Sequence, residues 1–236
     1  MTKPLLEICC ANAASCDNAA ALGVERIELC TALELGGISP NAALIAYAVS
    51  LELNTMVLIR PRSGDFYFSA QEQVLMLKEI EEALAIGAAG VVIGGLKNER
   101  LDLDFLREAK KQFPKAKMTV HRAIDESKEY ESDLQAIIDL NYERVLTSGQ
   151  KMTAPEAAVY LGEIQAKYPG ITLLAGGGVR ANNVLELLNQ GIREVHFSAS
   201  LSATRHQQKL FSPNYGISDR QLIQEMKVLL EAYSKR

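Results

Sequence analysis

The sequence lacks the patterns that would place it in several common classes of protein. It has no block of lysines and arginines, and it is mildly acidic, with a net charge of −4 and a pI near 5.5. Nucleic-acid binding needs clustered cations, so no nucleic-acid partner is expected. The N-terminal apolar run is short and is interrupted by Glu7, which is too little for a signal peptide or a membrane span. We therefore expect a cytoplasmic protein with no membrane partner.

Three motifs of cofactor binding and catalysis are also missing. The first predicted strand leads into CCANAASC instead of GxGxxG, so no nucleotide cofactor is expected. No GxSxG elbow is present, which disfavours a Ser-His-Asp hydrolase. No predicted strand ends in a lysine, and the nearest one, Lys97, follows the fourth strand in a loop. This disfavours a Schiff-base aldolase.

The cysteines show no disulfide or zinc-finger pattern. All four stand within the first 30 residues, at Cys9, Cys10, Cys16 and Cys30, without a CxxC pair or a matched pair of histidines. A chain of 236 residues buries enough surface in one core to fold without a disulfide or a structural metal. In a reducing compartment these four residues should be free thiols.

A repeated pattern predicts the fold. A short apolar run, a polar loop and an amphipathic stretch with helical spacing recur eight times in 236 residues, which is about 30 residues for each βα unit. No linker interrupts the series, and eight alternating units favour a closed (β/α)8 barrel, an α/β TIM barrel, over an open sheet. We predict a single barrel domain over residues 1–236. Its strands are expected at 5–9, 26–30, 55–60, 90–94, 117–122, 144–148, 171–175 and 194–198.

Several helix starts can also be predicted, because hydroxyl side chains in front of a helix cap its free N–H groups. Ser39 precedes a proline, which is favoured at the first helical position. Three further pairs have the spacing of a capping box. These pairs are Ser69 with Glu72, Thr153 with Glu156, and Ser218 with Gln221.

The first two predicted strands repeat one another, with LEIC followed 21 residues later by IELC. Glu7 thus aligns with Glu28, and Cys9 with Cys30. Because side chains alternate along a strand and neighbouring strands lie about 4.8 Å apart, the two thiols can meet over one ion. Thiolates are soft ligands that select Cu(I) and Zn, so Cys9 and Cys30 are candidate metal ligands. The alternative is that they are simply small buried apolar side chains.

Other polar residues stand at the carboxyl ends of strands, where barrel enzymes carry their active sites. Glu7, Glu28, His121 and Asp125 are candidates for general acid and base chemistry, or for binding a divalent cation. His196 ends the eighth strand. In the alternative interpretation these carboxylates belong to an ion-pair network with the nearby arginines.

The remaining residues indicate a small anionic substrate, a class that includes phosphorylated metabolites. Arginines form bidentate contacts with carboxylates and phosphates, and backbone N–H groups of a glycine turn surround phosphate in many barrels. The candidate substrate-binding residues are Arg60, Arg62, Arg122, Thr147, Ser148, Gly176, Gly177 and Gly178. The glycines could equally serve only a tight turn.

Two loops add to the candidate site. The aromatic residues Phe66, Tyr67 and Phe68 follow the third strand and suit a lid over the barrel mouth or a subunit contact. About seventeen residues, 201–217, separate the eighth strand from the last helix and include His206. Loops of this length are usually functional, although His206 is expected to be a surface residue.

Taken together, these segments resemble the CutC family, named for copper homeostasis. The similar segments are LEICC at 6–10, RIELCTALELGGISP at 26–40, LIRPRSGDFYFS at 58–69, GVVIGGL at 90–96, TVHRAID at 119–125, RVLTSG at 144–149 and AGGGV at 175–179. The resemblance implies a cytoplasmic (β/α)8 barrel that forms a homodimer or larger homo-oligomer and takes part in copper handling. It also implies that Cys9 and Cys30 occupy the positions suspected of binding Cu(I).

Two functions therefore compete. In the first, the barrel binds Cu(I) through Cys9 and Cys30 and buffers it or passes it on. In the second, it is an enzyme of unknown reaction, an isomerase, lyase or metal-assisted hydrolase, acting on a small anionic metabolite at the carboxyl end of the barrel. A pure scaffold is the least favoured, because gathering charged groups at one end of a barrel costs desolvation energy.

Overall fold

The computed structural model describes residues 3–203 and 215–235. His206 and most of the predicted 201–217 loop lie outside these ranges. Within the described helices, none is long and apolar enough to cross a membrane.

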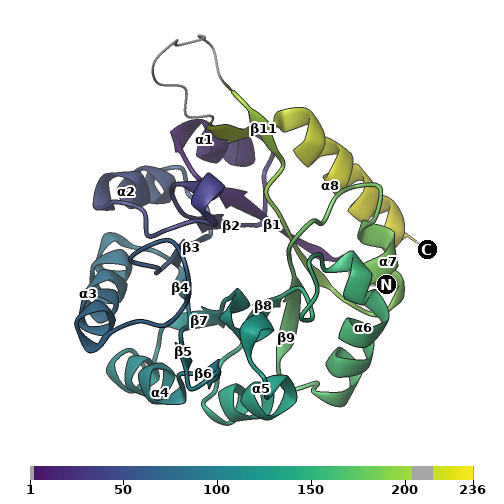
Figure 1. Ribbon diagram of the computed structural model, residues 1–236. Coiled ribbons are helices and arrows are strands. Elements are labelled where there is room, and N and C mark those ends of the chain that lie inside the picture. Colours follow the sequence, from purple (N-terminus) through teal and green to yellow (C-terminus); the bar gives the residue numbers. More distant parts are fainter. Residues whose placement is uncertain (1–2, 204–214, 236) are drawn as a thin grey trace, which may run out of the picture.

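The chain forms the predicted closed barrel of eight parallel strands (Figure 1). Each strand pairs with the next barrel strand along the chain, and β10 closes the barrel against β1. The barrel strands are β1 (Leu5–Cys10), β2 (Arg26–Leu29), β3 (Thr55–Leu58), β4 (Gly90–Ile93), β7 (Lys117–Val120), β8 (Arg144–Thr147), β9 (Thr172–Ala175) and β10 (Glu194–Phe197). The predicted fold class is thus confirmed, with strand boundaries within two residues of those expected.

A helix follows each barrel strand and packs on the outside of the barrel, forming the outer ring seen in Figure 1. These helices are α1 (Ala13–Ala21), α2 (Ala42–Ser50), α3 (Ala70–Ile86), α4 (Leu103–Gln112), α5 (Tyr130–Asp139), α6 (Ala158–Lys167), α7 (Val184–Asn189) and α8 (Arg220–Ser234). The short 3-10 turns are η1 (Leu33–Leu35), η2 (Arg122–Glu126) and η3 (Pro155–Ala157). Outside the barrel, β5 (Leu96–Lys97) pairs with β6 (Arg100–Leu101). In the same way, β11 (Ser200–Ser202) pairs with β12 (Gly216–Ser218).

The two faces of the strands carry different chemistry. Outward residues such as Ile8, Ile27 and Val57 are buried in a large apolar core shared with the helices. A second, small apolar cluster contains Cys9, Cys30, Met56, Leu58 and Val92, in the alternate positions of the same strands. Because side chains alternate along a strand, this second cluster fills the inside of the barrel.

One of the predicted helix starts is confirmed and three are wrong. Ser69 and Glu72 form the expected capping box at α3. Asn41 caps α2 instead of Ser39, and Asp219 caps α8 instead of Ser218. At Thr153 the chain enters the 3-10 turn η3, which has no side-chain cap. Ser39 and Ser218 bond to neighbouring segments instead: Ser39 accepts a hydrogen bond from the Arg60 N–H, and the Ser218 hydroxyl donates to the Cys9 carbonyl.

The capping box at α3 leads to a first prediction. Replacing Ser69 by alanine removes the oxygen that accepts the Glu72 N–H and should lower the free energy of unfolding by about 1 kcal/mol. Denaturant unfolding measures the loss. Ser50→Ala is the comparison, since the Ser50 hydroxyl is exposed at the end of α2, donates to the Tyr47 carbonyl and caps no helix N-terminus, so its loss should not lower the stability. An unchanged stability of Ser69→Ala would contradict the prediction.

Candidate functional site

A cavity of about 400 Å³ opens at the carboxyl ends of the barrel strands. Its volume is in the range of sites for small ligands. The structure brings eight of the predicted site residues to its wall: Cys9, Glu28, Cys30, Arg60, His121, Arg122, Gly177 and Gly178. Phe66, Arg180, His196 and Ser198 also line it. The predicted residues Glu7, Arg62, Asp125, Thr147, Ser148 and Gly176 lie outside the lining.

The two thiols of the repeated strand motif meet at one side of this cavity. The Cys9 and Cys30 sulfur atoms are 3.6 Å apart, and both residues are buried. The contact with Cys30, together with burial, raises the pKa of the Cys9 thiol well above its usual value. Binding of a metal by Cys9 therefore has to displace a proton.

A network of buried charges lies inside the barrel next to the thiols. Arg26 is only 4% exposed, and its guanidinium Nε donates to Glu7 over 2.5 Å. The same guanidinium donates to Glu194, which also accepts from Arg144. On its other side, Glu7 accepts from His196 Nδ1 over 2.8 Å. This network ties β1, β2, β8 and β10 together, and each charge within it has a partner.

Two carboxylates share His196, and their environments give them opposite pKa shifts. Glu28 lies 3.3 Å from His196 Nδ1 but forms no hydrogen bond with Arg26, and burial raises its pKa to about 7. Burial also acts on Glu7, but the bonds with His196 and Arg26 outweigh it and lower its pKa. For His196, burial lowers the pKa, but the charges of Glu28 and Glu7 raise it by more, so the net shift is upward. The raised pKa favours a protonated His196 ring between the two acids.

Cys9, Glu28 and His196 form the one cluster of three or more metal-ligating side chains found among residues 3–203 and 215–235. One ligand atom from each lies within 4.8 Å of the others. The divalent-cation set considered from the sequence, Glu7 and Glu28 with His121 and Asp125, is not gathered in this way. Glu7 is held by Arg26 and His196, and Asp125 is bonded elsewhere.

Arg60 is held in the cavity wall by two loops. Its Nη1 donates to the carbonyl oxygens of Leu35 and Gly37, and its Nη2 donates to that of Gly64. Gly36 and Gly37 have φ of +84° and +82°, a conformation that glycine adopts without strain. The segment LELGG, residues 33–37, thus points two of its carbonyl groups at the Arg60 guanidinium. Burial and the nearby charge of Arg62 lower the pKa of Arg60.

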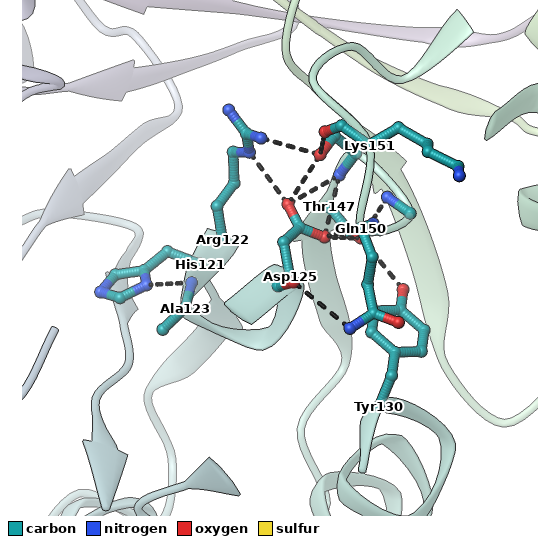
Figure 2. A network of polar contacts seen from close by, with 10 residues as sticks. His121, Arg122, Ala123, Asp125, Tyr130, Thr147, Gln150 and Lys151 are labelled. Atoms are coloured by element: carbon teal, nitrogen blue, oxygen red, sulfur yellow. Dashed lines mark hydrogen bonds and ion pairs between the residues drawn. The ribbon is translucent and has the colours of Figure 1, made fainter. Parts of the chain in front are cut away.

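His121 lies beside Arg60 and is kept neutral by its surroundings. Burial, and then the charge of Arg60, lower its pKa to about 3. Its Nδ1 accepts the N–H of Ala123 over 3.1 Å (Figure 2), so the proton of the neutral ring lies on Nε2. Phe66 contacts both residues: its ring centroid is 4.9 Å from that of His121 and 5.0 Å from the Arg60 guanidinium carbon.

Asp125 positions Arg122 and does not face the cavity. Figure 2 shows it accepting hydrogen bonds from the Thr147 hydroxyl and the Arg122 guanidinium, and it also accepts from the Ser148 N–H. The Ser148 hydroxyl accepts a further bond from Arg122 Nη2. These bonds fix the 3-10 turn η2 against the end of β8. Thr147, Ser148 and Asp125 therefore act behind the cavity wall, by holding Arg122 at its edge.

Arg62 and the glycine turn differ from what their sequence positions suggested. The Arg62 guanidinium points into its own loop, where it pairs with Asp65 and Glu72. Gly177 and Gly178, with φ of +98° and +68°, border the cavity next to Arg122 and Thr153, whereas Gly176 packs against Leu146 and His196. The following helix α7 begins only at Val184, so the turn does not lead directly into a helix N-terminus.

Two residues of the site received no role from the sequence. Arg26 begins β2 and His196 lies near the end of β10. The signal for both was alternation: Arg26 stands two positions before Glu28, and His196 two positions after Glu194. Residues two apart in a strand share a face, so each belongs to the same inner face as a carboxylate.

Comparison with known proteins gives a consistent set of relatives. The model of the CutC family matches residues 4–201. A CutC family protein of Bacteroides thetaiotaomicron is 41% identical over 204 residues, covering 84% of this chain and 82% of that protein. One from Sinorhizobium medicae is 34% identical over 231 residues, covering 97% and 94%.

Solved structures show the same fold. A protein from Streptococcus agalactiae, solved under the name CutC and proposed to act in copper homeostasis, has a TM-score of 0.78 at 22% identity and covers 83% of this chain and 98% of its own. Thiamine phosphate pyrophosphorylase from Pyrococcus furiosus has a TM-score of 0.60 at 16% identity, covering 98% and 96%. At these identities the likeness concerns the barrel alone.

Proposed function

Because this chain belongs to the CutC family, whose relatives include a protein proposed to act in copper homeostasis, we propose that it binds Cu(I) through Cys9 and Cys30. The observation that carries the proposal is the separation of the two sulfur atoms, 3.6 Å. Four-coordinate metal sites with metal–sulfur bonds of about 2.3 Å hold their sulfur atoms about 3.8 Å apart. The two thiols are thus already spaced for one ion.

The surroundings of the thiols favour a soft, singly charged ion. Met56, Leu58 and Val92 form one apolar cluster with the two cysteines, so one side of the thiols faces a nonpolar environment. Glu28, or His196 once it has lost its proton, lies close enough to Cys9 to supply one further ligand. A thiolate pair with an imidazole suits Cu(I), whereas Mg²⁺ and Ca²⁺ prefer all-oxygen sites.

Binding of Cu(I) by thiols requires a reducing environment, so we place the protein in the cytoplasm. All four cysteines are free thiols in the structure, which agrees with this location. Assembly into a homodimer or larger oligomer, which the family resemblance implied, stays a prediction.

Anaerobic titration with Cu(I) against a high-affinity competing chelator tests the proposal. We expect one ion per chain, with Cys9→Ser and Cys30→Ser each weakening the affinity by more than the roughly 10- to 100-fold that loss of an outer-shell partner costs. Cys16→Ser is the matched control. Cys16 is a buried thiol from the same part of the chain, but it lies in α1 outside the cavity wall, so its replacement should leave the affinity unchanged.

Circular dichroism of each variant shows whether it remains folded. Equal Cu(I) affinities for the wild type and for both cavity variants would remove the thiol pair from the binding site. A comparable loss in Cys16→Ser would point to general binding by thiols, and would also count against the proposal.

A further inference from the structure

Two N–H groups in the cavity wall have no acceptor among residues 3–203 and 215–235. Arg60 Nε and His121 Nε2 are buried side-chain nitrogens without a hydrogen-bond partner among the described residues. A buried donor without an acceptor costs roughly 1–3 kcal/mol, so such groups are rare in native proteins. Both residues line the same cavity, and Phe66 contacts both. The two groups therefore belong to one place in the wall.

Arg60 also lacks a counter-ion. It is 6% exposed, and within the described residues its guanidinium bonds only to the carbonyl oxygens of Leu35, Gly37 and Gly64. The remaining segments, 1–2, 204–214 and 236, contain no aspartate or glutamate. No acidic side chain among the described residues forms an ion pair with this guanidinium, and the charge of Asp65 acts on it only from a distance. By contrast, buried Arg26 pairs with Glu7 and Glu194.

His121 adds a second donor without adding charge. Its Nδ1 already accepts the Ala123 N–H, which fixes the proton on Nε2. Because Arg60 and neutral His121 present one N–H each, the place requires an acceptor that carries negative charge and has few oxygens. A carboxylate meets this requirement with its two oxygens. A phosphate dianion has more oxygens and would need further donors, and the Arg122 guanidinium in the same wall is already bonded to Asp125 and Ser148.

We propose that Arg60 and His121 form a binding site for the carboxylate of a small organic acid, in the same cavity as the thiol pair. The carboxylate accepts from Arg60 Nε and His121 Nε2. Both nitrogens are closed to solvent in this structure, so the Phe66 side chain, which contacts both residues, has to move aside when the ligand binds. The cavity of about 400 Å³ admits a small metabolite attached to that group. The site depends on neither thiol, so it stands whether or not the protein binds copper. It also supplies a ligand class for the enzyme interpretation of the sequence.

Nuclear magnetic resonance of the metal-free, ¹⁵N-labelled protein tests the site. The probe is sodium acetate, titrated at constant ionic strength against chloride and, separately, against inorganic phosphate. We expect saturable shifts of the N–H signals of Arg60 Nε and His121 Nε2 with acetate, weaker shifts with phosphate and none with chloride. Acetate shifts should persist in Cys9→Ser, which separates this result from the copper measurement.

Three variants make the test specific. His121→Leu removes one donor and should weaken acetate binding, read from the Arg60 signal, by about 10- to 100-fold. His121→Gln keeps an N–H donor and should restore part of the affinity. Arg193→Met is the matched control, because Arg193 also bonds to backbone carbonyls and lies over an aromatic ring, Tyr233, but it is outside the cavity wall.

Unshifted N–H signals in acetate, or equal affinities of the wild type and His121→Leu, would overturn the proposal. Tighter binding of phosphate than of acetate would overturn its assignment to a carboxylate. A loss of acetate binding in Arg193→Met equal to that in His121→Leu would show a general change of fold and would also count against it.

Discussion

Replacing Arg26 by methionine is expected to lower the free energy of unfolding by about 3–5 kcal/mol, because it leaves buried carboxylates without their cation. Arg26 is 4% exposed and bonds to Glu7, which is 1% exposed, and to Glu194. Surface ion pairs contribute only about 0–1 kcal/mol, so the size of the loss shows whether Arg26 behaves as part of a buried or of a surface ion pair. Urea unfolding followed by circular dichroism measures it.

The carboxylate partner provides the control for this prediction. Arg26→Met combined with Glu7→Gln removes both the cation and one of the charges left behind, and it should be less destabilised than Arg26→Met alone. Arg107→Met provides a surface comparison, since Arg107 pairs with Asp104 on the outside of α4 and both are exposed. A loss below 1 kcal/mol for Arg26→Met, similar to that for Arg107→Met, would contradict the role of the buried network.

Acidification is expected to destabilise the protein through His121. The pKa of His121 is about 3 in the folded protein, against an ordinary value of 6.5. At pH values between these two, His121 binds a proton in the unfolded chain but not in the folded protein. Stability therefore falls as the pH drops below 6.5, by about 1.4 kcal/mol for each pH unit, and the contribution is fully present only above 6.5.

A comparison of pH profiles isolates this residue from the other titrating groups. His121→Leu cannot take up the proton, so between pH 7 and pH 5 its stability relative to the wild type should rise by about 2 kcal/mol. Unfolding is measured in a buffer without carboxylates, because a bound anion would stabilise the folded state. Parallel profiles for the two proteins would show that His121 titrates normally in the folded state.

The sequence predicted the barrel because the fold depends on a pattern that is local and repeated. Each strand needs only a short apolar run, and the order of eight strands follows from their alternation with helices. The approach of Cys9 to Cys30 was predictable because both residues lie on the inner face of adjacent strands, although the register pairs Cys9 with Glu28 and Glu7 with Arg26, two residues away from the alignment of the repeated motif. Alternation of side chains and the spacing of strands were sufficient.

The hydrogen-bond partners of the charged side chains were harder to predict. They depend on the direction in which each side chain points as well as on the face of the sheet where it lies. Arg62 stands two positions after Arg60 at the end of the same predicted strand, yet it turns back to Asp65 and Glu72. The β3 strand ends at Leu58, so the alternation of faces no longer applies there. Arg60 is directed by carbonyl groups of loops that no short-range pattern describes.

The predictions of helix N-termini were wrong where the serine forms hydrogen bonds with another segment of the folded chain. Ser218 has the spacing of a capping box with Gln221, but Asp219 accepts the helix N–H groups instead. The Ser218 hydroxyl is then free to donate to the carbonyl of Cys9, and its N–H donates to Ser15. Such contacts join residues about 200 positions apart and leave no local signal.

That contact between Ser218 and Cys9 bears on how the protein is made. The two thiols lie within the first 30 residues and leave the ribosome early, whereas His196 and Ser218, which lie against Glu7 and Cys9, come from the last fifth of the chain. For most of its synthesis the polypeptide therefore carries both thiols without the groups that enclose them. Because of this order of residues along the chain, closure of the site is one of the last events in the synthesis and folding of each molecule.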